Sequence, residues 1–136
     1  MISLYTPYTL YKYFIMAYIF CPPNHHIHGL WPEFDSKHWP SYCHNEHFSL
    51  KGLNLTRMND RWSSCYPSHL SNYNFWKHEW EKHGTCSPFN RTEYFNTVLE
   101  IDDWLRRTGV LEKRCKGYCM IPLNLNFTLR FTWQMF

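Results

Sequence analysis

Two histidine-containing segments hold the residues whose types and spacing could do chemistry. Residues 27–32 read Ile-His-Gly-Leu-Trp-Pro, and residues 75–86 read Phe-Trp-Lys-His-Glu-Trp-Glu-Lys-His-Gly-Thr-Cys. Histidine changes its charge near neutral pH, so two imidazoles can act as acid and base under neutral or mildly acidic conditions. With a cation and a carboxylate beside them, the two segments predict acid–base catalysis by a pair of histidines.

The second segment has to present its polar groups on one side of a helix. It is rich in good helix formers, and we expect a helix that ends at Gly84. Each residue turns a helix by about 100°, so four polar side chains fall within one arc of about 140°. Glu79 and His83 are neighbours one turn apart, and the helix dipole favours a protonated imidazole at His83. The four residues of the arc are His78, Glu79, Lys82 and His83.

Two other interpretations of this arc stay open. The first is a solvated helix face with charge pairs. The second is a zinc site, for which the His-Glu-x-x-His motif needs histidines one turn apart, whereas His78 and His83 are five residues apart. Closely spaced cysteines occur only at Cys115 and Cys119, without the matching second pair of a structural zinc site. We therefore predict no metal and no cofactor.

The first segment must place an imidazole beside a turn. Gly29 permits a backbone bend next to His28. Trp31 offers a flat apolar wall with one N–H donor.

The elements around these segments can be read from apolar runs. Residues 13–20 are nearly all apolar and predict a buried strand, since a signal peptide would have a basic start and a small-residue cleavage site. Residues 92–107 predict a helix that Thr92 caps and Gly109 stops. Residues 127–133 predict a short strand.

Composition limits the classes of protein that remain. A chain of 136 residues indicates one domain. Aromatic residues make up 20% of it, which excludes an ordinary disordered chain, and no apolar run is long enough to predict a membrane span. Residues 104–136 hold six Lys or Arg and one acid, so this end favours polyanions such as nucleic acid.

Cysteines and glycosylation motifs point to an oxidising compartment. Six cysteines fit a disulfide framework, although spacing alone does not choose among the 15 possible pairings. Three Asn-x-Thr motifs give possible glycosylation sites at Asn54, Asn90 and Asn126.

The two histidine segments resemble the active-site segments of the ribonuclease T2 family in order, spacing and nearly every residue. Residues 39–43 and 62–65 resemble the family as well. The family comprises secreted or vacuolar acid endoribonucleases, including plant S-like and self-incompatibility ribonucleases. The resemblance implies an α+β fold, a mostly antiparallel sheet packed with helices, with the catalytic histidines on one helix and one strand.

The resemblance also implies roles for individual residues. His28, Glu79 and His83 match the catalytic residues: His83 would take the proton of the RNA 2′-hydroxyl, and His28 would protonate the leaving 5′-oxygen. The product would be a 2′,3′-cyclic phosphate, which the same pair can open with water in reversed roles. No metal is required, and DNA, which lacks the 2′-hydroxyl, would be inert.

Four further positions can be interpreted from the same resemblance. Lys82 matches the lysine that helps to hold the charged phosphorane, and His78 matches the histidine that binds phosphate. Trp31 matches a base-stacking aromatic residue. The family often has Asp after Trp-Pro, where this chain has Glu33, so no base preference is implied.

The resemblance also bears on how the cysteines pair. Cys43 and Cys86 match a family disulfide. We further expect Cys21 to pair with Cys65, and the two cysteines that remain, Cys115 and Cys119, to pair with each other. Localisation outside the cell or in the vacuole or lysosome follows from the family.

The resemblance covers about residues 21–108. Residues 1–20 form an atypical apolar N-terminal segment, and residues 109–136 form a divergent basic C-terminal segment. Because family domains are longer, we expect a truncated or mis-spliced member with both ends of the core incomplete. We predict a monomer that acts on RNA. The alternatives are a catalytically inactive secreted glycoprotein remnant of the family and an RNA-binding module that uses the aromatic residues and the basic tail.

Overall fold

A three-stranded antiparallel sheet forms one layer of the molecule. The computed structural model describes residues 11–35 and 37–130. The strands are β1 (Tyr13–Cys21), β2 (Asn24–Glu33) and β3 (Cys119–Leu123), in the spatial order β2-β1-β3. Phe14, Met16 and Tyr18 of the central strand β1 are almost fully buried, so the apolar run is the predicted buried strand. Strand β1 lies almost entirely before residues 21–108, the part that resembles the family, and β3 lies after it, so the sheet joins residues from both sides of that part.

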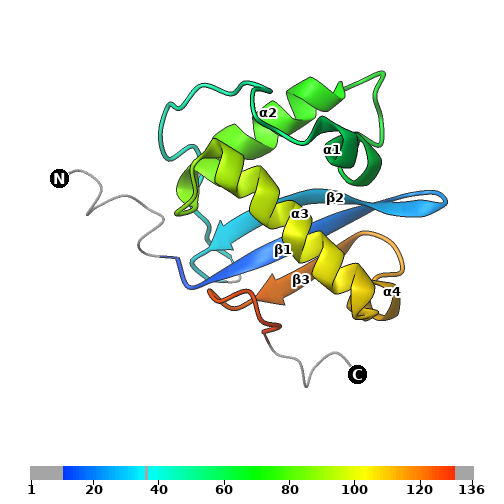
Figure 1. Cartoon of the computed structure of the whole chain (residues 1–136). Coiled ribbons are helices and arrows are strands. Elements are labelled where there is room, and N and C mark those ends of the chain that lie inside the picture. The colour runs from blue at the N-terminus through cyan, green and yellow to red at the C-terminus, as the bar shows by residue number, and fades with distance from the viewer. Residues whose placement is uncertain (1–10, 36, 131–136) are drawn as a thin grey trace.

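Helices cover the sheet and complete the predicted α+β fold. Figure 1 shows the long α3 crossing the sheet, with α1 and α2 beyond it on the side of β2. The helices are α1 (Leu55–Arg61), α2 (Asn72–Lys82), the 3₁₀ turn η3 (Gly84–Cys86), α3 (Arg91–Arg107) and α4 (Val110–Arg114). No helix within the described ranges is long and apolar enough to cross a membrane.

The start of α3 differs from the sequence prediction, whereas its end does not. Asn90, not Thr92, caps the helix: its side chain accepts a hydrogen bond from the Glu93 amide at 2.8 Å, and the Glu93 carboxylate accepts one from the Asn90 amide at 2.9 Å. This reciprocal capping box satisfies two free amides, which Thr92 could not do from inside the first turn. At the other end the prediction is confirmed. Gly109 directly follows the C-cap Thr108, has the left-handed φ of 79° and donates its amide to the carbonyl of Arg106, as a helix-ending glycine does.

The predicted strand at 127–133 is wrong for residues 127–130. Phe127 lies in a turn with φ of 66°, closed by hydrogen bonds between the backbones of Asn124 and Thr128 and of Phe127 and Asn124. Beyond it Leu129 makes a single bridge to Leu123, and residues 131–133 lie outside the described residues. The third strand forms earlier, at Cys119–Leu123, where Ile121 and Leu123 are buried.

Three disulfides join the elements. Cys21 at the end of β1 is bonded to Cys65 between α1 and α2, and Cys43 is bonded to Cys86 in η3. Cys115 is bonded to Cys119, which connects the end of α4 to the start of β3. These bonds fasten to the fold both the loop after β2 and the segment before β3.

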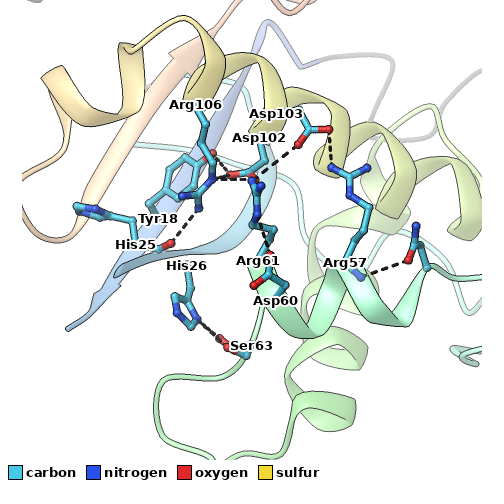
Figure 2. Close-up of polar contacts among 11 residues, drawn as sticks. Tyr18, His25, His26, Arg57, Asp60, Arg61, Ser63, Asp102, Asp103 and Arg106 are labelled. Atoms are coloured by element: carbon cyan, nitrogen blue, oxygen red, sulfur yellow. Dashed lines mark hydrogen bonds and ion pairs between the residues drawn. The ribbon is translucent and has the colours of Figure 1, made fainter. Parts of the chain in front are cut away.

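A buried carboxylate links α3 to α1 and the sheet. Asp102 is completely buried and accepts hydrogen bonds from Tyr18 of β1, Arg61 of α1 and Arg106 one turn along α3, at 2.7–3.0 Å. Arg106 also donates to the backbone carbonyl of His25 in β2. Figure 2 shows these groups converging, with a neighbouring pair between Arg57 and Asp103. Here the buried charge is fully paired, as a stable fold requires.

Candidate active site

A β-bulge places the imidazole of His28. In the pairing of β1 with β2, Ala17 faces Gly29 and Tyr18 faces Ile27, so His28 is the extra residue in the register. A bulge redirects the side chain of its extra residue. The carbonyl of His28 accepts a hydrogen bond from the buried Trp62 indole at 3.0 Å, which fixes the bulge from the helical side.

Gly29 is needed for a close approach. A Cβ at this position would collide with Oε1 of Glu79 and with the indole nitrogen of Trp31. The glycine therefore lets the strand come directly against the carboxylate of α2, which is a different role from the bend that the sequence predicted. Tyr94 secures the next residue, since its hydroxyl donates to the carbonyl of Leu30 at 3.0 Å.

Glu79 connects the two histidine segments. It is completely buried on α2, and its Oε1 accepts a hydrogen bond from Nε1 of Trp31 at 2.8 Å. Its Oε2 lies 3.6 Å from Nδ1 of His28, and neither of these two atoms has a hydrogen-bond partner among the residues described. Because Glu79 is buried, a solvated helix face is excluded.

The end of α2 positions His83 slightly differently from the prediction. Ser71 caps the start of the helix, the last helical residue is Lys82, and His83 is the C-cap. Gly84 does not adopt the left-handed conformation of a helix-ending glycine. A Cβ there would collide with the ring of Trp80 and crowd that of Tyr94, so Gly84 allows the chain to turn against the core.

His83 is a buried imidazole that is held neutral. Only 5% of it is exposed, and its ring stacks on that of Trp31, with centroids 4.9 Å apart. Burial lowers the pKa of His83 to about 4, because the charged form would be desolvated, and the Glu79 carboxylate only partly opposes this effect. The charges of Lys82 and His78 also lower the pKa. Desolvation therefore outweighs the helix dipole, which had predicted a protonated ring.

All six predicted catalytic and substrate-binding positions meet in one cavity of about 310 Å³. Its walls come from β2, from α2 and its C-cap, from the loop after β2, and from the segment around β3. The lining residues are His28, Trp31, Glu33, Trp39, His78, Glu79, Lys82, His83, Tyr118 and Met120.

Four of these lining residues were not predicted as site residues. Trp39 lies in a segment that resembles the family, and Glu33 directly follows the first histidine segment. Burial, with a smaller effect of the Asp35 charge, raises the pKa of Glu33 to about 7. Tyr118 and Met120 carry no sequence signal, because they reach the cavity only through the pairing of β3 with β1.

The remaining predicted positions lie elsewhere. Asn54, Asn90 and Asn126 are exposed, and the first two cap α1 and α3. Asn126 accepts hydrogen bonds from Thr128. In the ranges 11–35 and 37–130 no three His, Cys, Asp or Glu side chains gather as metal ligands.

Comparison with known proteins gives consistent matches. The model of the Ribonuclease T2 family matches residues 13–116. Intracellular ribonuclease LX of Solanum lycopersicum is 40% identical over 78 residues, which are 54% of this chain and 32% of that protein. The crystal structure of human RNase T2 aligns with a TM-score of 0.59 and 31% identity, over 76% of this chain and 61% of that chain.

A third match carries a nucleotide. A mutant of RNase MC1 in complex with 5′-UMP aligns with a TM-score of 0.60 and 26% identity, over 79% of this chain and 64% of that chain. The present chain spans about a third of the length of ribonuclease LX.

Proposed function

The chain belongs to the ribonuclease T2 family, and on this premise we propose that it is an endoribonuclease that cleaves single-stranded RNA through a 2′,3′-cyclic phosphate. The observation that carries the proposal is the meeting of His28 and His83 in one cavity, with Glu79 and Trp31 between them. The two imidazoles come from different elements, a bulged strand and a helix end, so each has its own environment. A general acid and a general base must differ in this way.

His83 is the general base. A base must be neutral when the substrate arrives, and the depressed pKa of about 4 keeps His83 neutral over most of the acid range. It removes the proton of the RNA 2′-hydroxyl, whose oxygen attacks the adjacent phosphorus. The bond from the 2′-oxygen to phosphorus forms as the bond from phosphorus to the 5′-oxygen breaks.

His28 is the general acid. Its Nδ1 faces Oε2 of Glu79 at 3.6 Å, which leaves the opposite ring nitrogen, Nε2, to donate to the leaving 5′-oxygen. Hydrogen bonds of catalytic groups are often long before substrate binds, and the unpaired Nδ1 and Oε2 atoms fit a contact that tightens then. In the second step His28 takes a proton from water, the hydroxide opens the cyclic phosphate, and His83 returns a proton to the 2′-oxygen.

Lys82 and His78 bind the phosphate. Both line the cavity one turn apart on α2, and the ammonium group stabilises the negative charge that grows on the phosphorane oxygens. Trp31 contributes to binding the base with the part of its ring that His83 does not cover. The 5′-UMP complex of the RNase MC1 mutant supports a nucleotide site on this fold.

Location and partners follow from the same proposal. Three disulfides favour passage through an oxidising compartment, so the protein is secreted or stored in a vacuole or lysosome, with glycans at Asn54, Asn90 and Asn126. It acts as a monomer on RNA and leaves DNA intact, because DNA lacks the nucleophile.

Cleavage of matched oligonucleotides tests the proposal. The purified protein is incubated with an RNA and a DNA of one sequence in EDTA, and the fragments are resolved by gel electrophoresis. We expect cleavage of the RNA alone. A folded protein that binds RNA without cutting it would indicate an RNA-binding module, and one that does neither would indicate an inactive family remnant. Activity that EDTA abolishes would contradict the metal-free mechanism.

A further inference from the structure

Tyr118 is an exposed aromatic ring beside the proposed general acid. It lines the cavity and lies edge-on to His28, with centroids 6.3 Å apart, yet 58% of the residue is exposed. His28 also contacts the rings of Phe75 and Trp31. Phe75 is buried and Trp31 is stacked on His83. Of the three rings around His28, Tyr118 thus has the largest surface open to a ligand.

The segment that carries Tyr118 is fixed on several sides. The disulfide between Cys115 and Cys119 encloses it, and Cys119 is paired with Tyr18 in the sheet. His25 of β2 makes a hydrogen bond through Nε2 to the carbonyl of Gly117 at 3.0 Å. A ring on such a segment needs little further ordering when a ligand arrives, which favours binding.

The chemistry assigns one part of the substrate to this side of the cavity. His28 donates its proton to the 5′-oxygen, so the nucleoside that leaves with this oxygen lies next to His28. The ribose that supplies the 2′-hydroxyl lies at His83, on which Trp31 is stacked. Tyr118 contacts the first of these two histidines, and exposed Lys116 in the same segment adds a positive charge close by in the chain.

We propose that Tyr118 is the stacking platform for the base of the leaving nucleoside. This inference rests on the proposed function and adds a substrate-binding residue from a segment beyond the family match, which ends at residue 116. Every base offers a flat face to an aromatic ring, so the contact helps all leaving nucleosides. Removal of one such ring lowers kcat/KM by about 5- to 150-fold, the effect of a single stacked base.

Two substrates separate this contact from the rest of the site. A dinucleoside monophosphate has a leaving nucleoside, whereas a nucleoside 2′,3′-cyclic phosphate has none and reports the second step alone. Both are assayed with the parent, Tyr118→Ala, Tyr118→Phe and the control Tyr66→Ala, in which a tyrosine of similar exposure outside the cavity is removed. A third substrate, the dinucleotide with an abasic leaving ribose, tests the base itself.

We expect Tyr118→Ala to lose activity on the dinucleotide only, Tyr118→Phe to retain it, and Tyr66→Ala to match the parent. The parent should prefer the dinucleotide with the leaving base over its abasic form, and Tyr118→Ala should lose that preference. If Tyr118→Ala loses activity equally on the dinucleotide and the cyclic phosphate, or on neither, the inference is overturned. The proposed function still stands in that case, because the parent is active. A parent that acts on neither substrate overturns both.

Discussion

Among the residues that the structure describes, two carboxylates are completely buried, and their surroundings are opposite. Asp102 accepts hydrogen bonds on both oxygens, from Tyr18, Arg61 and Arg106. Glu79 is equally buried, but its Oε1 has one donor and its Oε2 has none among the residues described. The hydrogen bonds of Asp102 join α3 to α1 and the sheet, whereas Oε2 of Glu79 can still accept a hydrogen bond.

Under the proposed function, this difference separates a structural charge from a catalytic one. A buried polar atom without a partner costs free energy of roughly 1–3 kcal/mol, so a fold keeps it only where the surroundings enforce it. In the cavity Nδ1 of His28, Oε2 of Glu79 and Nδ1 of His83 are all unpaired. Their meeting at one place fits the proposed function, in which substrate completes these contacts, whereas the Asp102 cluster is complete already.

The largest effect is expected from removal of either histidine. His28→Ala and His83→Ala should each lower RNA cleavage by about 100- to 10,000-fold, because each removes one proton-transfer group. The double variant should lose little more, since the two act as one unit. Initial rates on a fluorogenic RNA measure this, after circular dichroism has shown that each variant is folded. Cleavage by folded His83→Ala at nearly the parent rate would contradict the assignment of the base.

Exchange of each carboxylate for its amide tests the comparison directly. Asp102→Asn should lower the free energy of unfolding by about 3 kcal/mol, the low end for a broken buried pair, because Arg61 and Arg106 are partly exposed and can be hydrated. Its folded fraction should cleave RNA at nearly the parent rate.

Glu79→Gln should behave in the opposite way. It keeps the acceptor for Trp31 but loses the charge that faces His28, so we expect a loss of about 10- to 100-fold in kcat from a poorly positioned acid, with little change in stability. Urea unfolding and kcat are measured for both variants. A Glu79→Gln variant that unfolds readily, or an Asp102→Asn variant that is stable but inactive, would reverse the roles.

The pH dependence sharpens the description of the cavity. The pKa of His83 is lowered to about 4, so the base is neutral above that pH and is lost by protonation below it. We expect kcat/KM to fall on the acid side about tenfold per pH unit below about pH 4. Because the mechanism needs a protonated acid as well as a neutral base, the profile should be bell-shaped, with its maximum on the acid side of neutrality. Rates from about pH 3 to pH 8 test this; a flat profile would contradict the two-histidine mechanism.

The smallest effect is expected at histidines outside both regions. His44 and His69 are exposed. His44 lies in a segment without helix or strand, His69 lies in a turn, and neither lines the candidate active-site cavity. His44→Ala and His69→Ala should retain cleavage within about twofold and stability within about 0.5 kcal/mol, as for ordinary surface changes. A large loss in either would show that the cavity does not contain the whole site.

The candidate site could be predicted from the sequence to a large extent because its chemistry is local. His78, Glu79, Lys82 and His83 lie on one turn and a half of chain, so helical spacing alone places them together. The bulge that redirects His28 could not be predicted, because it depends on the register of β2 against β1. The role of Gly29 was missed for the same reason, since the colliding carboxylate belongs to α2.

The fold was predicted less completely than the site. The apolar run of β1 and the stripe of α3 identified these elements, and Gly109 marked the end of α3, but the start of α3 depended on the capping by Asn90. The third strand was misplaced because the run at Phe127 has strand-forming residues, while the turn from Asn124 to Thr128 decides its conformation. Tyr118 entered the cavity through long-range pairing, which local pattern does not encode.

The central claim is cleavage by attack of the RNA's own 2′-hydroxyl, and the products of a chimeric oligonucleotide test it most directly. The substrate is a single-stranded DNA with one internal ribonucleotide, incubated with the protein in EDTA and examined by mass spectrometry at early times. We predict a single cut on the 3′ side of the ribonucleotide, with a 2′,3′-cyclic phosphate on one fragment and a 5′-hydroxyl on the other. Fragments with 5′-phosphates, or cuts between deoxynucleotides, would contradict the account.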